Sequence, residues 1–181
     1  MVKLTDKEII LKGVTLNFEH IFKPATSKNY PDAEPKYSAT FMLNKKTHIS
    51  QIDQINQIIN LIAKEQEWKK KADKLTFRDG DESEIDSLQG YYTVKAASKN
   101  RPQIVHRDLS PIVKEDGLIH NGNIVDAHIR FFFSTLWKGI TAELVSIQYK
   151  QQGTQLGRPT VDVFDIYEKE EINNLESEFG F

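Results

Sequence analysis

One long strand changes its side-chain alternation partway, and this change restricts the fold more than any other feature of the sequence. Residues 140–150 alternate apolar and polar side chains, but the apolar set moves to the other parity near Leu144 and Val145. A bulge or a sharp bend produces such a change, because one extra residue reverses which side chains face inward. The preceding run, 125–133, has an unbroken apolar face, and 137–139 predicts the turn between the two strands. Bent strands of this kind are needed to close a small barrel.

The other segments predict further strands and a single helix. Alternating side chains predict strands at 8–22, 36–44, 91–96, 104–107 and 161–166. Ile52, Ile55, Ile59 and Ile62 form one helical stripe, which predicts an amphipathic helix from about Ser50 to Lys70, capped by Ser50 and with Lys69, Lys70 and Lys71 at its C-terminal end. The acidic, turn-rich segment 78–90 is predicted to be a flexible connection. Five to seven strands with one helix favour a mainly β fold, a small antiparallel barrel, over a doubly wound sheet.

The charge of the chain is divided between a basic body and an acidic end. The sequence has 181 residues with 24 basic and 26 acidic side chains. Residues 165–181 hold one lysine and six carboxylates, so the rest carries 23 basic and 20 acidic residues: a body of +3 and a tail of −5. We therefore expect one domain at 1–164 and a disordered acidic tail at 165–181. The tail either competes with a polyanion for the basic body or only aids solubility.

The sequence argues against catalysis. There is no cysteine, which excludes disulfides and thiolate chemistry. His106-Arg107-Asp108-Leu109 matches the start of a kinase catalytic loop, but Val113 stands where that motif requires asparagine, and no glycine-rich phosphate loop is present. The histidines form no HExxH pair. We expect no enzyme activity, no cofactor and no metal; a magnesium-dependent nuclease at Asp79, Asp81 and Glu82 is a distant alternative. No run is long and apolar enough to span a membrane, which favours the cytoplasm.

Basic and aromatic side chains share the polar faces of several predicted strands. Proteins that hold single-stranded nucleic acid combine cations that follow the phosphates with aromatic rings on which bases stack. The candidate DNA-binding residues on these faces and turns are Tyr91, Lys95, Lys99, Arg101, Arg107, His128, Arg130, Phe132, Trp137, Lys150 and Arg158. Any one of them is equally well a solvated side chain or, for Phe132 and Trp137, a half-buried packing residue. The pattern as a whole favours single-strand binding.

Five segments in order resemble the phage single-stranded-DNA-binding proteins of the OB-fold type, which end in an acidic tail with an aromatic last residue. They are KYSATFMLNK at 36–45, GYYTVKAASKNRPQIVHRD at 90–108, GNIVDAHIRFFFS at 122–134, GITAELVSIQYKQQGTQLG at 139–157, and Phe181. The resemblance covers about half of the chain. It implies an OB-fold-like barrel that binds and protects single-stranded DNA without sequence preference in phage DNA replication and recombination.

The resemblance also implies roles for the tail. In such proteins the tail competes with DNA for the groove and contacts replication proteins, such as a polymerase or a helicase-primase. The tail residues expected to bind partners are Glu170, Glu171, Glu176, Glu178, Phe179 and Phe181. The resemblance allows a homodimer and places a phage-encoded protein in the host cell cytoplasm. The alternative is an accessory factor that binds a protein instead of DNA and whose acidic tail keeps it soluble, since a body of +3 is modest for a DNA-binding protein.

Overall fold

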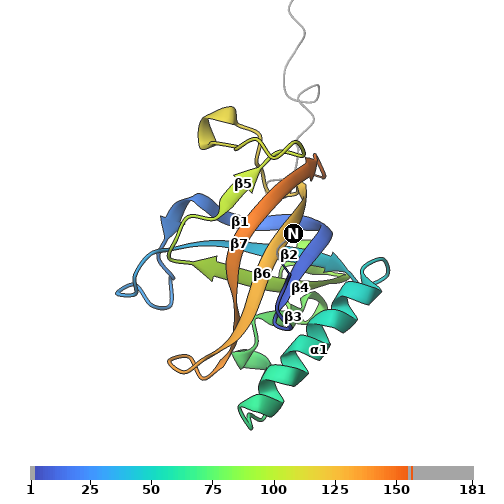
Figure 1. Ribbon diagram of the computed structural model, residues 1–181, viewed down its shortest axis with the longest axis vertical. Helices are drawn as coiled ribbons and strands as arrows, with labels where there is room; N and C mark the ends of the chain where they lie inside the picture. Colours follow the sequence, from blue (N-terminus) through green and yellow to red (C-terminus); the bar gives the residue numbers. More distant parts are fainter. Residues whose placement is uncertain (1–2, 155, 157–181) are drawn as a thin grey trace, which may run out of the picture.

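The architecture is a β-barrel with one helix packed against it (Figure 1). The computed structural model describes residues 3–154 and Leu156. The strands are β1 (Glu8–Ala25), β2 (Lys36–Asn44), β3 (Phe77–Asp79), β4 (Tyr91–Ser98), β5 (Gln103–Val105), β6 (Ile124–Ser134) and β7 (Gly139–Gln151), and the helix is α1 (Ile49–Glu65). The predicted strands at 8–22, 36–44, 91–96, 104–107, 125–133 and 140–150 correspond to six of these seven.

Five of the strands form a closed barrel. The strand order in the sheet is β3-β4-β2-β1-β6-β7-β5, and β4 also pairs with β7. This second pairing is parallel and joins Ala96 to Ala142 and Ala97 to Glu143. It closes the ring β1-β2-β4-β7-β6, while β3 and β5 extend the sheet beside β4 and β7. The mainly β barrel expected from the sequence is confirmed.

The change of alternation in β7 is a bulge at Val145. His128 and Ile129 are adjacent on β6, but their partners on β7 are Ser146 and Leu144, so Val145 has no partner of its own. Leu144 and Ile147 are both buried on the inner side, whereas Val145 is exposed. The extra residue bends β7, as the sequence predicted, and the bend lets one strand pair with β4, β5 and β6.

Strand β1 reaches both of its neighbours because it bends at a glycine. Its first half pairs with β6, from Glu8 to Thr15, and its second half pairs with β2, from Thr15 to Ala25. The register shifts between Leu11 and Val14, where Gly13 has φ of 63°. Residues with a side chain rarely adopt this left-handed backbone, so glycine suits the position.

The core lies inside the barrel and beneath α1. The inward side chains of β6, Val125, Ala127, Ile129 and Phe131, are almost fully buried, as their alternation predicted. The helix contributes the predicted stripe, which packs into the same cluster as the barrel interior. In Figure 1, α1 lies at the lower right of the barrel and β5 lies at the opposite end.

The predicted ends of the helix were wrong. The residue before its first turn is His48, whose carbonyl accepts a hydrogen bond from the Ile52 amide, and Ser50 is already inside the helix. The helix ends at Glu65 because Glu67 takes a left-handed backbone with φ of 49°. Trp68 then turns back against Phe133, with ring centroids 5.8 Å apart. The lysines at 69–71 therefore lie beyond the helix.

Segment 78–90 is ordered, although its composition predicted a flexible connection. It contains the end of β3 and two 3₁₀ turns, at Gly80–Glu82 and Asp86–Leu88. The Lys45 ammonium lies 2.5 Å from a carboxylate oxygen of Asp79 and 2.5 Å from one of Asp81. Asp81 also accepts a hydrogen bond from the Gly90 amide at 2.7 Å. These contacts hold the acidic segment against the start of β4.

Part of the sequence-based prediction lies outside the described residues. This applies to the strand expected at 161–166, to Arg158 and to the acidic tail at 165–181. Within the part of the chain that is described, no helix is long and apolar enough to cross a membrane.

Candidate nucleic-acid interface

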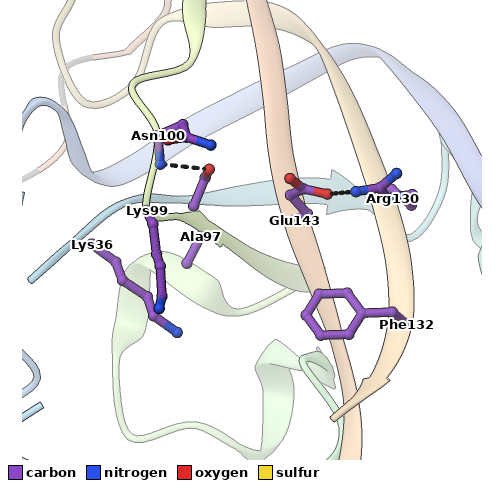
Figure 2. Close-up of a pocket in the computed structure, with 8 residues that line it drawn as sticks. Lys36, Ala97, Lys99, Asn100, Arg130, Phe132 and Glu143 are labelled. Carbon is purple, nitrogen blue, oxygen red and sulfur yellow. Dashed lines mark hydrogen bonds and ion pairs between the residues drawn. The ribbon is translucent and has the colours of Figure 1, made fainter. Parts of the chain in front are cut away.

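A groove of about 460 Å³ lies on the outer surface of the barrel, where four strands meet (Figure 2). The residues that line it are Lys36, Ala97, Ser98, Lys99, Asn100, Arg130, Phe132 and Glu143. Lys36 begins β2, Ala97 and Ser98 end β4, Lys99 and Asn100 follow it, and the last three residues come from β6 and β7. The parallel contact between β4 and β7 creates the site, because it places the end of β4 beside the middle of β7.

Phe132 provides an exposed aromatic surface in this groove. It lies between Phe131 and Phe133 on β6, but alternation turns those two inward and Phe132 outward. Its exposed fraction is 43%, and its partner on β7 is the small residue Thr141. Figure 2 shows its ring on one side of the groove, with Lys36 and Lys99 on the other. A ring held this way suits the stacking of a planar base.

Cations surround the aromatic surface. Tyr37 pairs with Ser98, and this register places Lys36 close to Lys99 at one side of the groove. Lys99 forms an exposed ion pair with Glu34 at 2.9 Å. Arg130 forms an ion pair with Glu143, its direct partner on β7. Such exposed pairs contribute little to stability, so these cations can exchange a carboxylate for a phosphate.

Lys95 and Tyr91 extend along the outer face of β4. They share a face with Ala97, because side chains an even number of residues apart along a strand point the same way, and Lys95 and Tyr91 lie two and six residues before it. Lys95 is exposed and lies two residues from the groove lining. Tyr91 is half-buried at the far end of the strand, where it pairs with Asn44. Of the predicted residues, Lys99, Arg130 and Phe132 thus line the groove and Lys95 borders it.

Two other predicted residues, His128 and Lys150, lie on the outer face of β6 and β7, but each of them contacts a carboxylate. His128 Nε2 lies 3.0 Å from Glu8 Oε2, and this hydrogen bond lowers the pKa of the Glu8 carboxyl. The Lys150 ammonium lies 3.2 Å from the carboxylate of Asp126, a buried residue that also accepts a hydrogen bond from the Gly13 amide at 2.9 Å. Neither side chain lines the groove.

The remaining predicted residues lie apart from the groove. Trp137 lies at the turn between β6 and β7, where it is half-buried and the Lys74 ammonium is 5.3 Å from its ring. Arg101 stacks on Phe22 at 5.7 Å and borders a second cavity of about 430 Å³ beside β5. Arg107 is exposed in the turn after β5. Arg158 lies outside the described residues.

Five of the eight residues that line the groove were not predicted as site residues: Lys36, Ala97, Ser98, Asn100 and Glu143. Lys36 had been placed on the polar face of its strand, and its position at the strand's start gave no sign that it would meet the end of β4. Asn100 follows Lys99 directly. Glu143 is the only carboxylate among the lining residues that the structure describes. Sequence alternation shows which face a residue occupies, but not which distant strand lies beside it.

The aspartates considered for magnesium hold a lysine instead. Lys45 bridges Asp79 and Asp81, and hydrogen bonds to both carboxylates raise the pKa of the ammonium group. Among the described residues, no group of three or more histidine, aspartate or glutamate side chains is arranged to hold a metal ion. This cluster therefore fixes the start of β4 and gives no support to a nuclease centre.

The closed five-stranded barrel, with cations around an exposed aromatic ring on its outer surface, is of the OB-fold type that single-strand binders use. Residues 7–175 match the family model described as "Enterobacter phage Enc34, ssDNA-binding protein", and the chain belongs to this family. This membership confirms the resemblance noted from the sequence and the expectation that the protein is not an enzyme.

Individual relatives agree with the family assignment. The single-stranded DNA-binding protein from bacteriophage Enc34 is 25% identical, with a TM-score of 0.74 over 90% of each chain. A second structure of that protein, in complex with ssDNA, has a TM-score of 0.76 with 24% identity and covers 83% of this chain and 90% of its own. Putative protein p50 of Acyrthosiphon pisum secondary endosymbiont phage 1 is 28% identical over 91% of this chain and 98% of its own.

Proposed function

We propose that this protein binds single-stranded DNA without sequence preference, in the groove where β2, β4, β6 and β7 meet. The observation that carries the proposal is the exposed ring of Phe132, with Lys36, Lys99 and Arg130 around it, on the barrel of this family. A solved structure of the Enc34 protein, which shares the barrel, is in complex with ssDNA. Bases stack on the aromatic ring while the cations neutralise phosphates.

The same arrangement explains why the base sequence of the DNA has little influence on its affinity. Every base has a planar π face, so stacking on Phe132 accepts all four bases. Phosphate contacts from lysine and arginine carry no sequence information. Each phosphate neutralised on a single strand contributes about −0.7 to the slope of log affinity against log salt. Contacts from Lys36, Lys95, Lys99 and Arg130 therefore give a slope of about −3.

The acidic tail modulates this binding. Residues 1–164 form the binding domain, and residues 165–181 carry a net charge of −5 that competes with DNA for the cations of the groove. Once DNA displaces the tail, its acidic and aromatic residues are free to contact replication proteins, such as a polymerase or a helicase-primase. In this role the protein coats and protects single strands during phage DNA replication and recombination in the host cell cytoplasm, as a monomer or a homodimer.

Fluorescence anisotropy with labelled oligonucleotides tests the proposal. Single strands of poly(dT), poly(dA) and mixed sequence are titrated at two or more salt concentrations, with and without magnesium, beside a duplex of the mixed sequence. We expect affinities for the single strands within about tenfold of one another, weaker duplex binding, a steep loss with salt and no cleavage. No binding to any oligonucleotide would reject the proposal and favour the accessory factor that binds proteins.

A further inference from the structure

The basic side chains on the outer face of β6 and β7 each contact a carboxylate. Arg130 pairs with Glu143, His128 with Glu8, and Lys150 with Asp126. Only the first of these pairs lies in the groove. Glu143 thus places a negative charge at the point where the proposed function requires a phosphate to bind.

The Arg130–Glu143 pair is accessible and is not needed to hold the fold together. The two residues are direct partners across the antiparallel pairing of β6 and β7. Their side chains are 50% and 32% exposed. Figure 2 shows the pair beside Phe132, with the Arg130 guanidinium directed at the Glu143 carboxylate. An ion pair this exposed stabilises a protein little, so its place in an anion-binding groove calls for another explanation.

We propose that Glu143 is a selectivity residue that competes with phosphate for Arg130. This inference rests on the proposed function and assigns a role within its groove. When a phosphate binds Arg130, it replaces a carboxylate that already satisfies the guanidinium, so the exchange yields little net gain. The gain must then come from a base stacking on Phe132. A ligand with phosphates but no exposed bases, such as duplex DNA, is therefore rejected.

Replacing the carboxylate by an amide tests this mechanism. Glu143→Gln keeps the size of the side chain but removes its charge. Arg130 can then bind a phosphate without first giving up a carboxylate. We expect duplex affinity to rise about tenfold and single-strand affinity only about threefold, because single-strand binding already gains from stacking.

Three further variants serve as controls in the same anisotropy titrations. Arg130→Gln weakens binding, and the Arg130→Gln/Glu143→Gln double variant returns close to the original affinity, because both charges are then absent. Glu84→Gln makes the same charge change at an exposed residue outside the groove lining and is expected to alter affinity less than twofold. Thermal melts verify that each variant is folded.

The outcomes distinguish a failure of this inference from a failure of the proposed function on which it rests. A larger gain for duplex than for single strands with Glu143→Gln supports the competitor role. Equal gains, no gain, or weaker binding would overturn it, and weaker binding would mean that Glu143 positions Arg130 for the ligand. If the unaltered protein binds no single strand, both the proposed function and this inference fail. If the unaltered protein binds single strands but Glu143→Gln leaves the preference for single strands over duplex unchanged, the inference alone fails.

Discussion

Ala97 on β4 and Glu143 on β7 are neighbours across a parallel pairing that joins only two residue pairs. This short contact closes the barrel and also forms the floor of the groove, since both residues line it. The small side chain of Ala97 leaves the space between Lys99 and Arg130 open. The fold and the proposed binding site therefore depend on the same few atoms.

A charge introduced at Ala97 should change DNA affinity without unfolding the barrel. The residue is half-buried on the outer face, so a longer side chain can extend into the groove. Ala97→Glu adds a second carboxylate and should reduce single-strand affinity at least tenfold, whereas Ala97→Lys should increase it at low salt. Anisotropy titrations measure both. Similar losses for the two variants would mean that the groove is blocked by size, not charge.

The ion pairs of Lys45 with Asp79 and Asp81 predict a stability effect at residues that do not line the groove. Lys45→Met leaves the Asp79 and Asp81 carboxylates without their cation, although both remain partly solvated. We expect the free energy of unfolding, measured by urea denaturation, to fall, because two neighbouring carboxylates lose the cation between them. Amide exchange should increase within 78–90, the segment that the cluster holds.

Lys46→Met is the matched control for this prediction. Lys46 is the next residue, is exposed and has no ion pair among the described residues. The control should change stability by less than about 0.5 kcal/mol. Equal effects of the two substitutions would show that lost charge, and not the lost bridge, is responsible.

Asp126 predicts a loss of stability in acid. Burial alone would raise the pKa of this carboxyl, but the Gly13 amide and the Lys150 ammonium together hold it below its ordinary value of 3.8. The folded state therefore favours the charged form, and the contribution is complete above about pH 5 and is lost as pH falls below about 4. Asp126→Ala should cost about 1–3 kcal/mol at pH 7. In urea melts, the difference from the unaltered protein should shrink toward pH 3; a constant difference would exclude the ionic contribution.

The strands and the bulge were predictable because alternation is local. The inward face of β6 and the change at Val145 can both be read from consecutive residues, since side chains alternate with a period of two. The ends of α1 were not predictable in this way. Ser50 looks like a suitable cap, but the chain enters the helix two residues earlier, where His48 Nδ1 accepts a hydrogen bond from the Asn44 amide at 3.0 Å.

The groove depends on contacts between distant segments. Lys99, Arg130 and Phe132 were predicted from composition and alternation, but only the pairing of β4 with both β2 and β7 brings them together with Lys36. Trp137 was also predicted from the sequence as a site residue, but it does not line the groove. A tryptophan at a turn suggested a stacking ring, yet Lys74 lies against that ring, because the β6–β7 turn approaches the segment before β3.

Deleting residues 165–181 should tighten binding to single-stranded DNA. The deletion removes a net charge of −5 and leaves a body of +3. We expect about a tenfold gain at low salt that shrinks near 0.5 M salt, where charges more than a few ångströms apart are screened. Replacing Phe179 and Phe181 by alanine should leave DNA affinity within twofold while reducing capture of replication proteins. Unchanged affinity after the deletion would exclude competition by the tail.

Phe132→Ala should weaken binding to single strands far more than binding to duplex DNA. Loss of one stacked base costs about 1–3 kcal/mol, which corresponds to a reduction of between five- and about 150-fold in single-strand affinity. Phe132→Trp should retain binding, because the larger ring preserves the stacking surface. Anisotropy titrations with one sequence in both forms measure the two losses.

Phe18 provides a control of equal exposure for this substitution. Its exposed fraction is also 43%, but it lies at a bend of β1 and does not line the groove. Phe18→Ala should therefore leave single-strand affinity within about twofold, whatever it does to stability. If Phe132→Ala reduced single-strand and duplex binding equally, or if Phe18→Ala reduced single-strand binding as much, Phe132 would act through folding and not as the surface on which bases stack.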